Sequence, residues 1–348
     1  MNDSDYIQIN KSSKVPRYRQ VIRSIINGIK AGKLQLGDKI PSINALSEAH
    51  DLSRDTVEKA YSQLKERNIV VSVRGKGYYI AETDLSIQMS VLFLINKLSS
   101  YKMRIFNAFV KQLGKNAKVD LDIYHCEPSV FKHTLNKKKE QYDFFVIMPH
   151  FKNEQFKHMG CPPDILKMLQ AFPKDKLIIM DQNIRQLPSQ VSRIYQDFKL
   201  DIFNALSDYL AQIKQYQKII LVFPSQSFYP YPEAIIIGFK YFCSTYKLHY
   251  EVLEQFKEDS TPELHALYIV IAESDLVNLV KQTKDRAYNM GQDIGIISYN
   301  DTPLKALLGI TVISTDFKNM GIIAAKAILE KQTKMVKNDF QLIQRLSA

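Results

Sequence analysis

The first hydrophobic pattern along the chain has the period of an α-helix. It starts after Pro16, a residue that suits the first turn of a helix, and stops before Gly32, which suits a carboxyl-terminal cap. The apolar side chains recur every three or four residues and therefore share one face. These side chains are Val21, Ile22, Ile25, Ile26 and Ile29. The pattern predicts an amphipathic helix between Pro16 and Gly32.

Two further helices are expected to follow at short intervals. Ser42 can cap a short helix with an apolar face, and the chain turns again at His50-Asp51. Ser53 can cap the next helix, which carries an apolar stripe at positions i, i+3, i+4 and i+7. The stripe consists of Val57, Ala60, Tyr61 and Leu64. A short helix, a tight turn and a second helix with a polar outer face form a helix-turn-helix, whose second helix enters the major groove of DNA.

A β-hairpin is expected directly after these helices. Residues 69–73 and 78–80 are rich in strand-forming side chains, and the glycines between them can supply the positive φ of a tight turn. Gly75 and Gly77 would let a tip that carries Arg74 and Lys76 approach a phosphate backbone or minor groove, as a wing. The alternative is that the glycines only make a turn and the two cations are solvated.

Beyond residue 83 the pattern changes to short continuous apolar runs that alternate with helical stretches. Such runs are typical of strands buried in parallel sheets. The predicted strands are Met89–Ile95, Val119–Tyr124, Phe144–Met148, Leu177–Asp181, Ile219–Phe223, Leu267–Ala272 and Ile294–Tyr299. Helical periodicity fills gaps between them, as over Met103–Leu113, Ile202–Ile213 and Met320–Leu329. The pattern predicts an α/β region with helices on both faces of the sheet.

The charge of the chain changes the picture of its first part. The 348 residues carry a net charge of +11, and residues 1–80 hold 14 Lys and Arg against 8 Asp and Glu. This balance favours a polyanionic partner. Nucleic acid is favoured over a membrane surface, because no basic amphipathic helix with a bulky apolar face accompanies the charge. A merely solvated surface is the alternative.

Other chemistry is not indicated by the sequence. The first residues lack the basic start and apolar core of a secretory signal, and no apolar run has the length of a membrane span. Cys126, Cys161 and Cys243 are odd in number and far apart, which fits reduced thiols. Neither metal-ligand spacing nor a nucleophile or phosphate-binding motif is present. We expect a cytoplasmic protein with no membrane partner, no metal, no cofactor and no enzymatic activity.

The third helix begins with residues suited to reading DNA. The Arg54 guanidinium could reach guanine O6 and N7 or a phosphate, whereas Lys59 suits phosphate as a point charge. Residues 15–80 resemble the winged helix-turn-helix of the GntR family of bacterial transcription regulators, through PRYRQVIRSIINGIKAGKLQLGDKIPS, LSRDTVEKAYSQLKERNIV and GKGYYI. The resemblance implies operator contacts by Arg54, the helix around Thr56 and Lys59, and the wing. Asn44 departs from the pattern, because an arginine is common at its place. The predicted DNA-binding residues are Arg17, Ser42, Asn44, Ser53, Arg54, Asp55, Thr56, Lys59, Arg74, Gly75, Lys76 and Gly77.

A second candidate site follows from the strand ends. In open α/β sheets, ligands bind beyond the carboxyl ends of the strands. This rule selects Pro149-His150, Asp181-Gln182, Ser225–Tyr231, Glu273-Ser274-Asp275 and Asn300-Asp301. Carboxylates and amides near Tyr229 or Tyr231 suit a polyhydroxylated ligand, because they pair with hydroxyls while the ring covers a sugar face. Alternatively, Ser274 or Asp275 only caps a helix and Asn300-Asp301 only makes a turn.

Residues 88–348 are similar to the effector domain of LacI-type repressors and to the periplasmic sugar-binding fold. The matching stretches are IIMDQN, LVFPSQS, AIIIGFKYF, YIVIAESDLV and DIGIISYNDTPLKALLGITVISTDFKNMGIIAAKAIL. The resemblance implies two α/β lobes that hold an effector between them, with Asp181, Ser274, Asp275 and Asn300 in the cleft. Ile235 and Asn300 depart from the pattern, in which an arginine and an aspartate are usual. The predicted effector-binding residues are Ser99, Tyr101, His150, Asp181, Gln182, Tyr229, Ser274, Asp275 and Asn300.

Together these patterns predict an α/β fold class with two domains. Residues 1–82 are expected to form a winged helix-turn-helix, and residues 83–348 a two-lobed, doubly wound, periplasmic-binding-protein-like effector domain. We expect a homodimeric regulator that binds double-stranded operator DNA near carbohydrate-utilisation genes. A repressor is favoured over an activator. The effector would be a monosaccharide such as arabinose or fucose, or a sugar phosphate. The alternatives are a non-sugar effector, a solute-binding protein and a fusion to a pyridoxal-phosphate enzyme.

Overall fold

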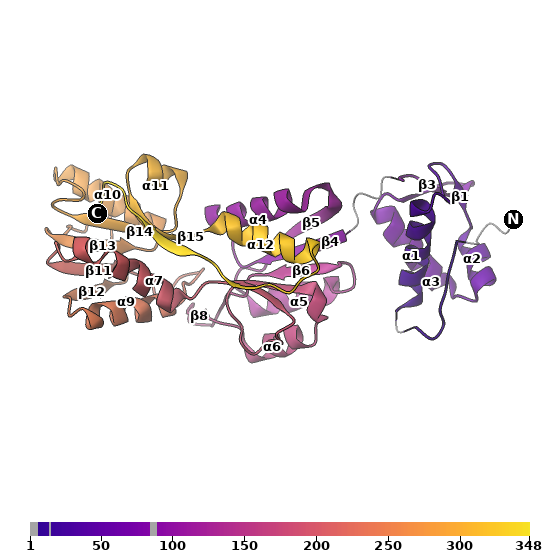
Figure 1. Cartoon of the computed structure of the whole chain (residues 1–348), viewed down its shortest axis with the longest axis horizontal. Helices are drawn as coiled ribbons and strands as arrows, with labels where there is room; N and C mark the ends of the chain where they lie inside the picture. Colours follow the sequence, from indigo (N-terminus) through magenta and orange to yellow (C-terminus); the bar gives the residue numbers. More distant parts are fainter. Residues whose placement is uncertain (1–5, 14, 84–88) are drawn as a thin grey trace. The chain divides into compact units, whose positions relative to one another are not determined.

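The computed structural model describes residues 6–13, 15–83 and 89–348 and divides the chain into two compact units (Figure 1). The first unit comprises Met1–Gln88 and the second Met89–Ala348. Across the described ranges, no helix combines the length and apolar character needed to span a membrane.

The first unit is a three-helix domain with a small antiparallel sheet. Its elements are α1 (Arg17–Lys30), β1 (Lys39–Ile40), α2 (Ile43–His50), α3 (Arg54–Glu66), β2 (Val70–Val73) and β3 (Gly77–Ile80). The strands pair in the order β1-β3-β2. The apolar face of each helix turns inward, and Val21, Leu46, Val57 and Leu64 are fully buried in one core. This confirms the predicted winged helix-turn-helix.

The second unit contains two lobes, each built on a six-stranded sheet. The sheet of lobe 1 is entirely parallel, in the order β16-β10-β9-β6-β4-β5. Its strands are β4 (Met89–Ile95), β5 (Ala117–Ile123), β6 (Phe144–Ile147), β9 (Leu177–Asp181), β10 (Ser192–Tyr195) and β16 (Met335–Lys337). One face is covered by α4 (Ser100–Leu113) and α12 (Phe317–Leu329), the other by α5 (Pro128–Lys138) and α6 (Pro163–Gln170). A short hairpin, β7 (Phe151–Lys152) and β8 (His158–Met159), follows β6.

Lobe 2 repeats this plan, in the strand order β12-β11-β13-β14-β15-β17. Its strands are β11 (Lys218–Val222), β12 (Tyr250–Leu253), β13 (Ala266–Val270), β14 (Gly295–Tyr299), β15 (Thr311–Thr315) and the antiparallel β17 (Phe340–Ile343). One sheet face packs against α7 (Phe198–Asp208), α8 (Leu210–Ile213) and α9 (Ala234–Thr245), and the other against α10 (Glu273–Asp285). A short helix, α11 (Pro303–Leu307), follows β14. The two lobes confirm the predicted doubly wound α/β architecture.

The chain passes between the lobes three times, from β10 to α7, from β15 to α12 and from β16 to β17 (Figure 1). Hydrogen bonds join the three crossing segments. Asn338 Nδ2 donates to Thr315 Oγ1, and Thr315 Oγ1 donates to the Asp339 carbonyl, both at 2.8 Å. The Asn338 amide donates to the Tyr195 carbonyl at 2.8 Å. Short segments bonded to one another in this way form a hinge through which the lobes can rotate as rigid bodies.

Two local predictions differ from the structure. The helix expected over Ile202–Ile213 is interrupted at Tyr209, whose φ of −107° and ψ of 15° leave the helical range. The Tyr209 side chain is buried, and its hydroxyl donates to the Ala348 carbonyl at 2.6 Å. Strands β10, β12, β15, β16 and β17 were not predicted, because they are short and mix polar with apolar residues.

Candidate DNA interface and effector cleft

The turn between α2 and α3 sets the exposed end of the candidate recognition helix. Asp51 ends α2 in the left-handed conformation with a φ of 49°, which favours a small polar residue. The Leu52 amide then donates to the Ser47 carbonyl at 3.0 Å. Ser53 caps α3 by accepting from the Thr56 amide at 3.2 Å, and their hydroxyls also pair at 2.7 Å. The first turn of α3 therefore starts at a fixed place.

The side chains at the start of α3 are largely in solvent. Arg54, Asp55 and Lys59 are exposed, while the opposite face of the helix is buried. The Lys59 ammonium lies 4.3 Å from the centre of the Tyr18 ring on α1, a cation–π contact that steadies a long side chain. Arg54 is thus presented at the amino end of the helix with its fork free to meet a base edge or phosphate.

The wing is the hairpin between β2 and β3, and its tip is exposed. Gly75 and Gly77 have φ of 75° and 108°, values that L-residues rarely adopt, so both positions require glycine. Arg74 and Lys76 project into solvent from this tip. A side chain at Gly77 would come within 3.2 Å of the Lys39 stem, so Lys39 adds a third cation beside the wing.

The structure exposes most of the residues predicted to bind DNA. Thr56 and Gly77 are half-buried and the other ten are exposed. Tyr18 and Lys39 were not predicted, and no pattern in the sequence marks them as neighbours of the reading surface. The positions that the sequence selected therefore lie on an accessible, predominantly basic surface.

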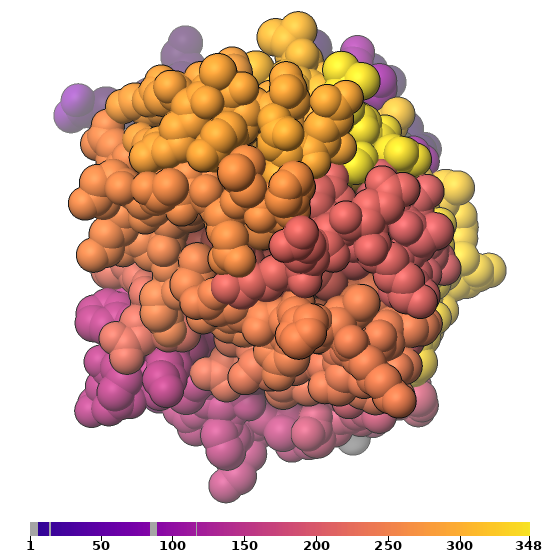
Figure 2. Space-filling model, turned by 90° about the vertical axis from the view of Figure 1, so that its left-hand side faces the viewer, coloured from indigo at the N-terminus to yellow at the C-terminus, as the bar shows by residue number. Residues whose placement is uncertain are grey.

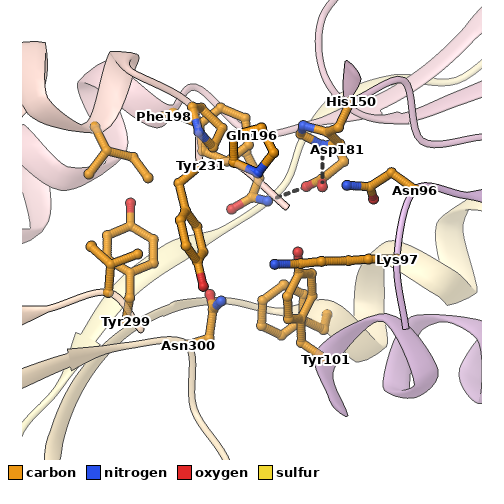
Figure 3. Close-up of a pocket in the computed structure, with 15 residues that line it drawn as sticks. Asn96, Lys97, Tyr101, His150, Asp181, Gln196, Phe198, Tyr231, Tyr299 and Asn300 are labelled. Atoms are coloured by element: carbon orange, nitrogen blue, oxygen red, sulfur yellow. Dashed lines mark hydrogen bonds and ion pairs between the residues drawn. The ribbon is translucent and has the colours of Figure 1, made fainter. Parts of the chain in front are cut away.

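In the second unit, a cavity lies between the two sheets at the carboxyl ends of their strands (Figure 3). Its lining from lobe 1 is Asn96, Lys97, Tyr101, His150, Asp181 and Phe317, and Gln196 lines it from the crossing segment between β10 and α7. Its lining from lobe 2 is Phe198, Pro230, Tyr231, Pro232, Ile235, Ile271, Tyr299 and Asn300. The free volume is about 40 Å³, below the roughly 300–1,000 Å³ of ordinary ligand pockets. A sugar could enter only if the lobes part or the side chains inside move.

Asp181 is the ionised centre of this cavity. Its carboxylate accepts from His150 Nε2 at 2.7 Å and from Gln196 Nε2. Burial opposes ionisation, but the hydrogen bonds from His150 and Gln196 and the nearby Lys102 ammonium hold the pKa of Asp181 below its usual value. Asp181 is therefore an acceptor at neutral pH, with lone pairs left for a ligand hydroxyl.

A histidine pair orients Asp181 from behind. His150 Nδ1 lies 3.1 Å from Gln182 Nε2 and 3.0 Å from His158 Nε2. Burial lowers the pKa values of both histidines, that of His158 to about 3. A neutral His150 donates from Nε2 to Asp181 and accepts at Nδ1, where Gln182 Nε2 and His158 Nε2 share its single lone pair.

Lys97 reaches into the cavity from the loop after β4 (Figure 3). Its ammonium lies 4.6 Å from the centre of the Tyr231 ring and 5.7 Å from that of Tyr229. Burial lowers the pKa of Lys97, although Cys126 and Asp181 act in the opposite direction. Lys97 therefore bridges the lobes by placing a lobe 1 cation on lobe 2 aromatic rings.

The backbone is strained where two lining residues sit. Asp181 and Asn300 have φ of 72° and 65° at the ends of β9 and β14. Non-glycine residues in this region cost on the order of 1–3 kcal/mol and cluster at functional sites. The strain aims both side chains into the cavity, which supports the assignment of these strand ends to a binding site.

The structure brings together only some of the predicted effector-binding residues. Tyr101, His150, Asp181 and Asn300 line the cavity, and Gln182 bonds to His150 behind it. The others lie outside the lining. Ser99 caps α4, Tyr229 bonds to His125 at 2.9 Å, Ser274 is exposed, and buried Asp275 accepts from the Phe256 amide at 3.2 Å.

Several lining residues were not predicted. They are Asn96, Lys97, Gln196, Phe198, Pro232, Ile271, Tyr299 and Phe317. Asn96 and Lys97 directly follow the first predicted strand, Met89–Ile95, and are therefore strand-end residues of the kind that binds ligands in open α/β sheets. Across the described residues, no group of three His, Cys, Asp or Glu side chains is arranged to hold a metal ion.

A winged helix-turn-helix joined to a two-lobed α/β unit is the architecture of a DNA-binding transcription regulator. Residues 17–80 match the model of bacterial regulatory proteins, gntR family. The chain is 41% identical over 183 residues to the HTH-type transcriptional regulator LutR of Bacillus subtilis, covering 48% of this chain and 84% of LutR. The chain belongs to the GntR family of bacterial regulatory proteins.

Other relatives and solved structures extend this picture. The HTH-type transcriptional repressor YtrA of Bacillus subtilis is 27% identical over 123 residues, covering 32% of this chain and 95% of YtrA. A LacI family transcriptional regulator from Lactobacillus casei, solved with bound glucose, has a TM-score of 0.59 at 14% identity and covers 74% of this chain and 99% of its own. The trehalose repressor from Escherichia coli has a TM-score of 0.56 at 14% identity, and the match covers 73% of this chain and 99% of the repressor chain. These two likenesses show the fold of the second unit.

Proposed function

We propose that this regulator is a homodimeric, cytoplasmic repressor of carbohydrate-utilisation genes, and that a sugar bound between its lobes controls it. The observation that carries the proposal is the cavity of the second unit, where the strand ends of two hinged lobes bring Asp181 and Asn300 together. Arabinose and fucose are candidate effectors. One solved neighbour of this fold, the LacI family regulator from Lactobacillus casei, has been solved with bound glucose and with bound sucrose.

The cavity offers the chemistry that a sugar needs. The Asp181 carboxylate and the amides of Asn96 and Asn300 can accept from and donate to neighbouring hydroxyls. Aromatic side chains, including Tyr231 and Phe198, supply flat apolar faces for a sugar ring. Small-molecule sites usually combine apolar walls with a small number of well-placed polar groups.

Hydrogen bonds connect the ligand position to the hinge. Gln196, which bonds to Asp181, belongs to the first crossing segment, and the Gln196 amide also donates to the Asp181 carbonyl at 3.2 Å. A ligand that bonds to Asp181 therefore acts on the segment about which the lobes rotate. A ligand shifts the equilibrium between open and closed lobes only by its difference in affinity for the two states. Contacts from both lobes, made only in the closed state, provide that difference.

A homodimer is supported by an apolar surface on α10 and α11 of lobe 2. Figure 2 views the molecule from the lobe 2 end. Val277 on α10 and Leu304 on α11 are 63% and 64% exposed, and both border a groove lined by Leu276, Val280, Leu308 and Ile310. Helix-turn-helix regulators bind paired half-sites as two-fold dimers, so a self-complementary surface is required. Leu304→Glu should yield monomers in sedimentation equilibrium, whereas Leu98→Glu on lobe 1, also exposed, should leave the dimer intact.

The test of the proposed function begins with DNA. The full-length protein should select a palindromic duplex from a random pool, with affinity that falls steeply with salt because phosphates are neutralised. A sugar should then release the protein from that duplex, and Asp181→Ala should prevent release. Failure to select any duplex would refute operator binding. Selection without release by any sugar would refute carbohydrate control.

A further inference from the structure

Buried ammonium groups surround the cleft of the second unit. Lys97 lines the cavity, and the fully buried Lys102 ammonium donates to Asn96 Oδ1 directly behind it. Lys305, only 4% exposed, donates to two backbone carbonyls at the end of β14, at 2.8 and 3.0 Å. The hydrogen-bond acceptors of Lys102 and Lys305 are neutral oxygens, and within the described residues neither ammonium forms an ion pair. Carboxylates act on them only from a distance, Asp181 on Lys102 and Glu273 and Asp301 on Lys305.

Negative charge is scarcer at the same place. Among the described lining residues, Asp181 carries the one carboxylate, and both of its oxygens already accept from protein groups. Outside the lining, Asp301 is bound to Arg345 at 2.9 Å, and Glu273, which is exposed, attracts Lys97 only from a distance. With His150 neutral, Lys97 and Lys102 outnumber Asp181, and the inner cleft is positively charged.

Lys97 is the cation that faces the cavity. Its ammonium end points into the middle of the lining residues (Figure 3). Within the described ranges no ion pair joins Lys97 to a carboxylate, and its partners are the Tyr231 and Tyr229 rings. Taking an ammonium out of water is costly unless an opposite charge accompanies it. A neutral sugar would desolvate Lys97 further, whereas an anion would compensate it.

Building on the proposed function, we propose that the effector is an anionic carbohydrate whose carboxylate or phosphate binds Lys97 Nζ. The Asn300 amide, also in the lining, can donate to the same anion, since it carries no competing charge. Asp181 and Asn96 bind hydroxyls on the uncharged part of the ligand. Lys102 lies behind this position and adds long-range attraction in a site that excludes water. A sugar acid and a sugar phosphate share this chemistry.

The test compares sugars in matched sets on the full-length protein. Glucose, galactose, arabinose and fucose are each measured beside the corresponding sugar acid and sugar phosphate, at constant ionic strength, with inorganic phosphate alone as a further probe. Binding is read as the rise in melting temperature. A ligand at about 100 times its Kd should raise it by about 5–10 °C, because ligand binding stabilises only the folded state.

Four variants locate the anion. Lys97→Met removes the charge at similar length and should weaken the charged ligand by about 30-fold or more, as expected for breaking a buried charge pair. Lys97→Arg keeps the charge and should retain most binding. Lys111→Met removes an exposed cation from α4 and should change nothing. Asp181→Ala removes the carboxylate proposed to bind ligand hydroxyls and should also weaken binding. Operator binding by each variant checks that it is folded.

The outcomes separate the effector chemistry from the cleft itself. The inference is supported if a sugar acid or sugar phosphate raises the melting temperature, its neutral sugar does not, and the rise is lost in Lys97→Met. Whichever of the acid and the phosphate gives the larger rise identifies the anion. A neutral sugar that binds while its charged forms do not, or an effect that survives Lys97→Met, overturns the inference and leaves the cleft as the effector site. No response to any carbohydrate, or a response that survives Asp181→Ala, overturns the proposed cleft and the inference with it.

Discussion

The two units of this regulator present their charged groups in opposite ways. In the first unit, Arg54, Arg74 and Lys76 stand in solvent on a capped helix and a glycine hairpin. In the second, Asp181 and Lys102 are buried and lie at strand or helix positions far apart in the sequence. Exposed cations suit a polyanion that arrives from outside, whereas buried charges depend on a fixed set of hydrogen-bonding and charged partners, here His150 and Gln196 for Asp181 and Asn96 for Lys102.

The buried charge should therefore be the more sensitive of the two. Asp181→Asn keeps the side-chain shape but removes the negative charge and replaces one of the two acceptor oxygens with a donor, and should weaken effector binding by about 2–5 kcal/mol. Operator affinity without effector should stay unchanged. Isothermal titration with the best ligand measures the first quantity and fluorescence anisotropy with labelled operator the second. The exposed Asp259→Asn is the matched control. Equal loss in both variants would break the contrast between the units.

The exposed cation on the recognition helix should have the next largest effect. Arg54→Ala should weaken operator binding by about 1–3 kcal/mol and relax specificity at one base position. Effector binding should be untouched, because that site belongs to the second unit. Lys65→Ala, an exposed cation near the other end of α3, is the control. If Lys65→Ala were the more damaging change, the reading end of α3 would be misassigned.

A third prediction concerns pH and isolates one buried charge. Burial lowers the pKa of Lys102 from its usual value near 10.5 to about 8. Between these values the unfolded chain holds a proton that the folded protein has released, so this residue makes stability rise with pH. Relative to Lys102→Met, the wild type should gain about 1–2 kcal/mol of unfolding free energy between pH 8 and 9.5. Urea titrations at each pH measure the difference. If the stabilities of the wild type and of Lys102→Met changed with pH in the same way, the pKa of Lys102 would not be lowered in the folded protein.

The same contrast explains how far the sequence could predict this molecule. Strands buried on both faces are continuous apolar runs, and β4 and β9 fall where predicted, at Met89–Ile95 and Leu177–Asp181. The strand β15 (Thr311–Thr315) was missed, because alternating Thr and Ser weaken its apolar signal. The first unit is local in sequence, and for that reason its caps, turn and wing could all be predicted from spacing.

The cleft was predicted only in part, for a physical reason. Asp181 was found because it ends a strongly apolar strand, but Gln196 follows a strand too polar to recognise. Lys97 resembles a solvated surface charge until the fold places Tyr231 against it. Asp275 was predicted to line the cleft, but its carboxylate accepts from the Phe256 amide and lies outside the cavity. Sequence selects strand ends, whereas packing decides which side chain at each end faces the ligand.

The smallest predicted effect belongs to the wing, and it sharpens the view of the first unit as a surface for phosphate. Lys76 is exposed at a tip fixed by Gly75 and Gly77, where it can contact the backbone of any sequence. Lys76→Ala should weaken operator and random duplexes alike by about 1 kcal/mol at most, and should reduce the slope of log K against log salt by about 1. Anisotropy titrations over a range of salt measure both. Selective loss of operator binding with an unchanged slope would mean that Lys76 reads a base edge, which would place sequence recognition in the wing as well as in α3.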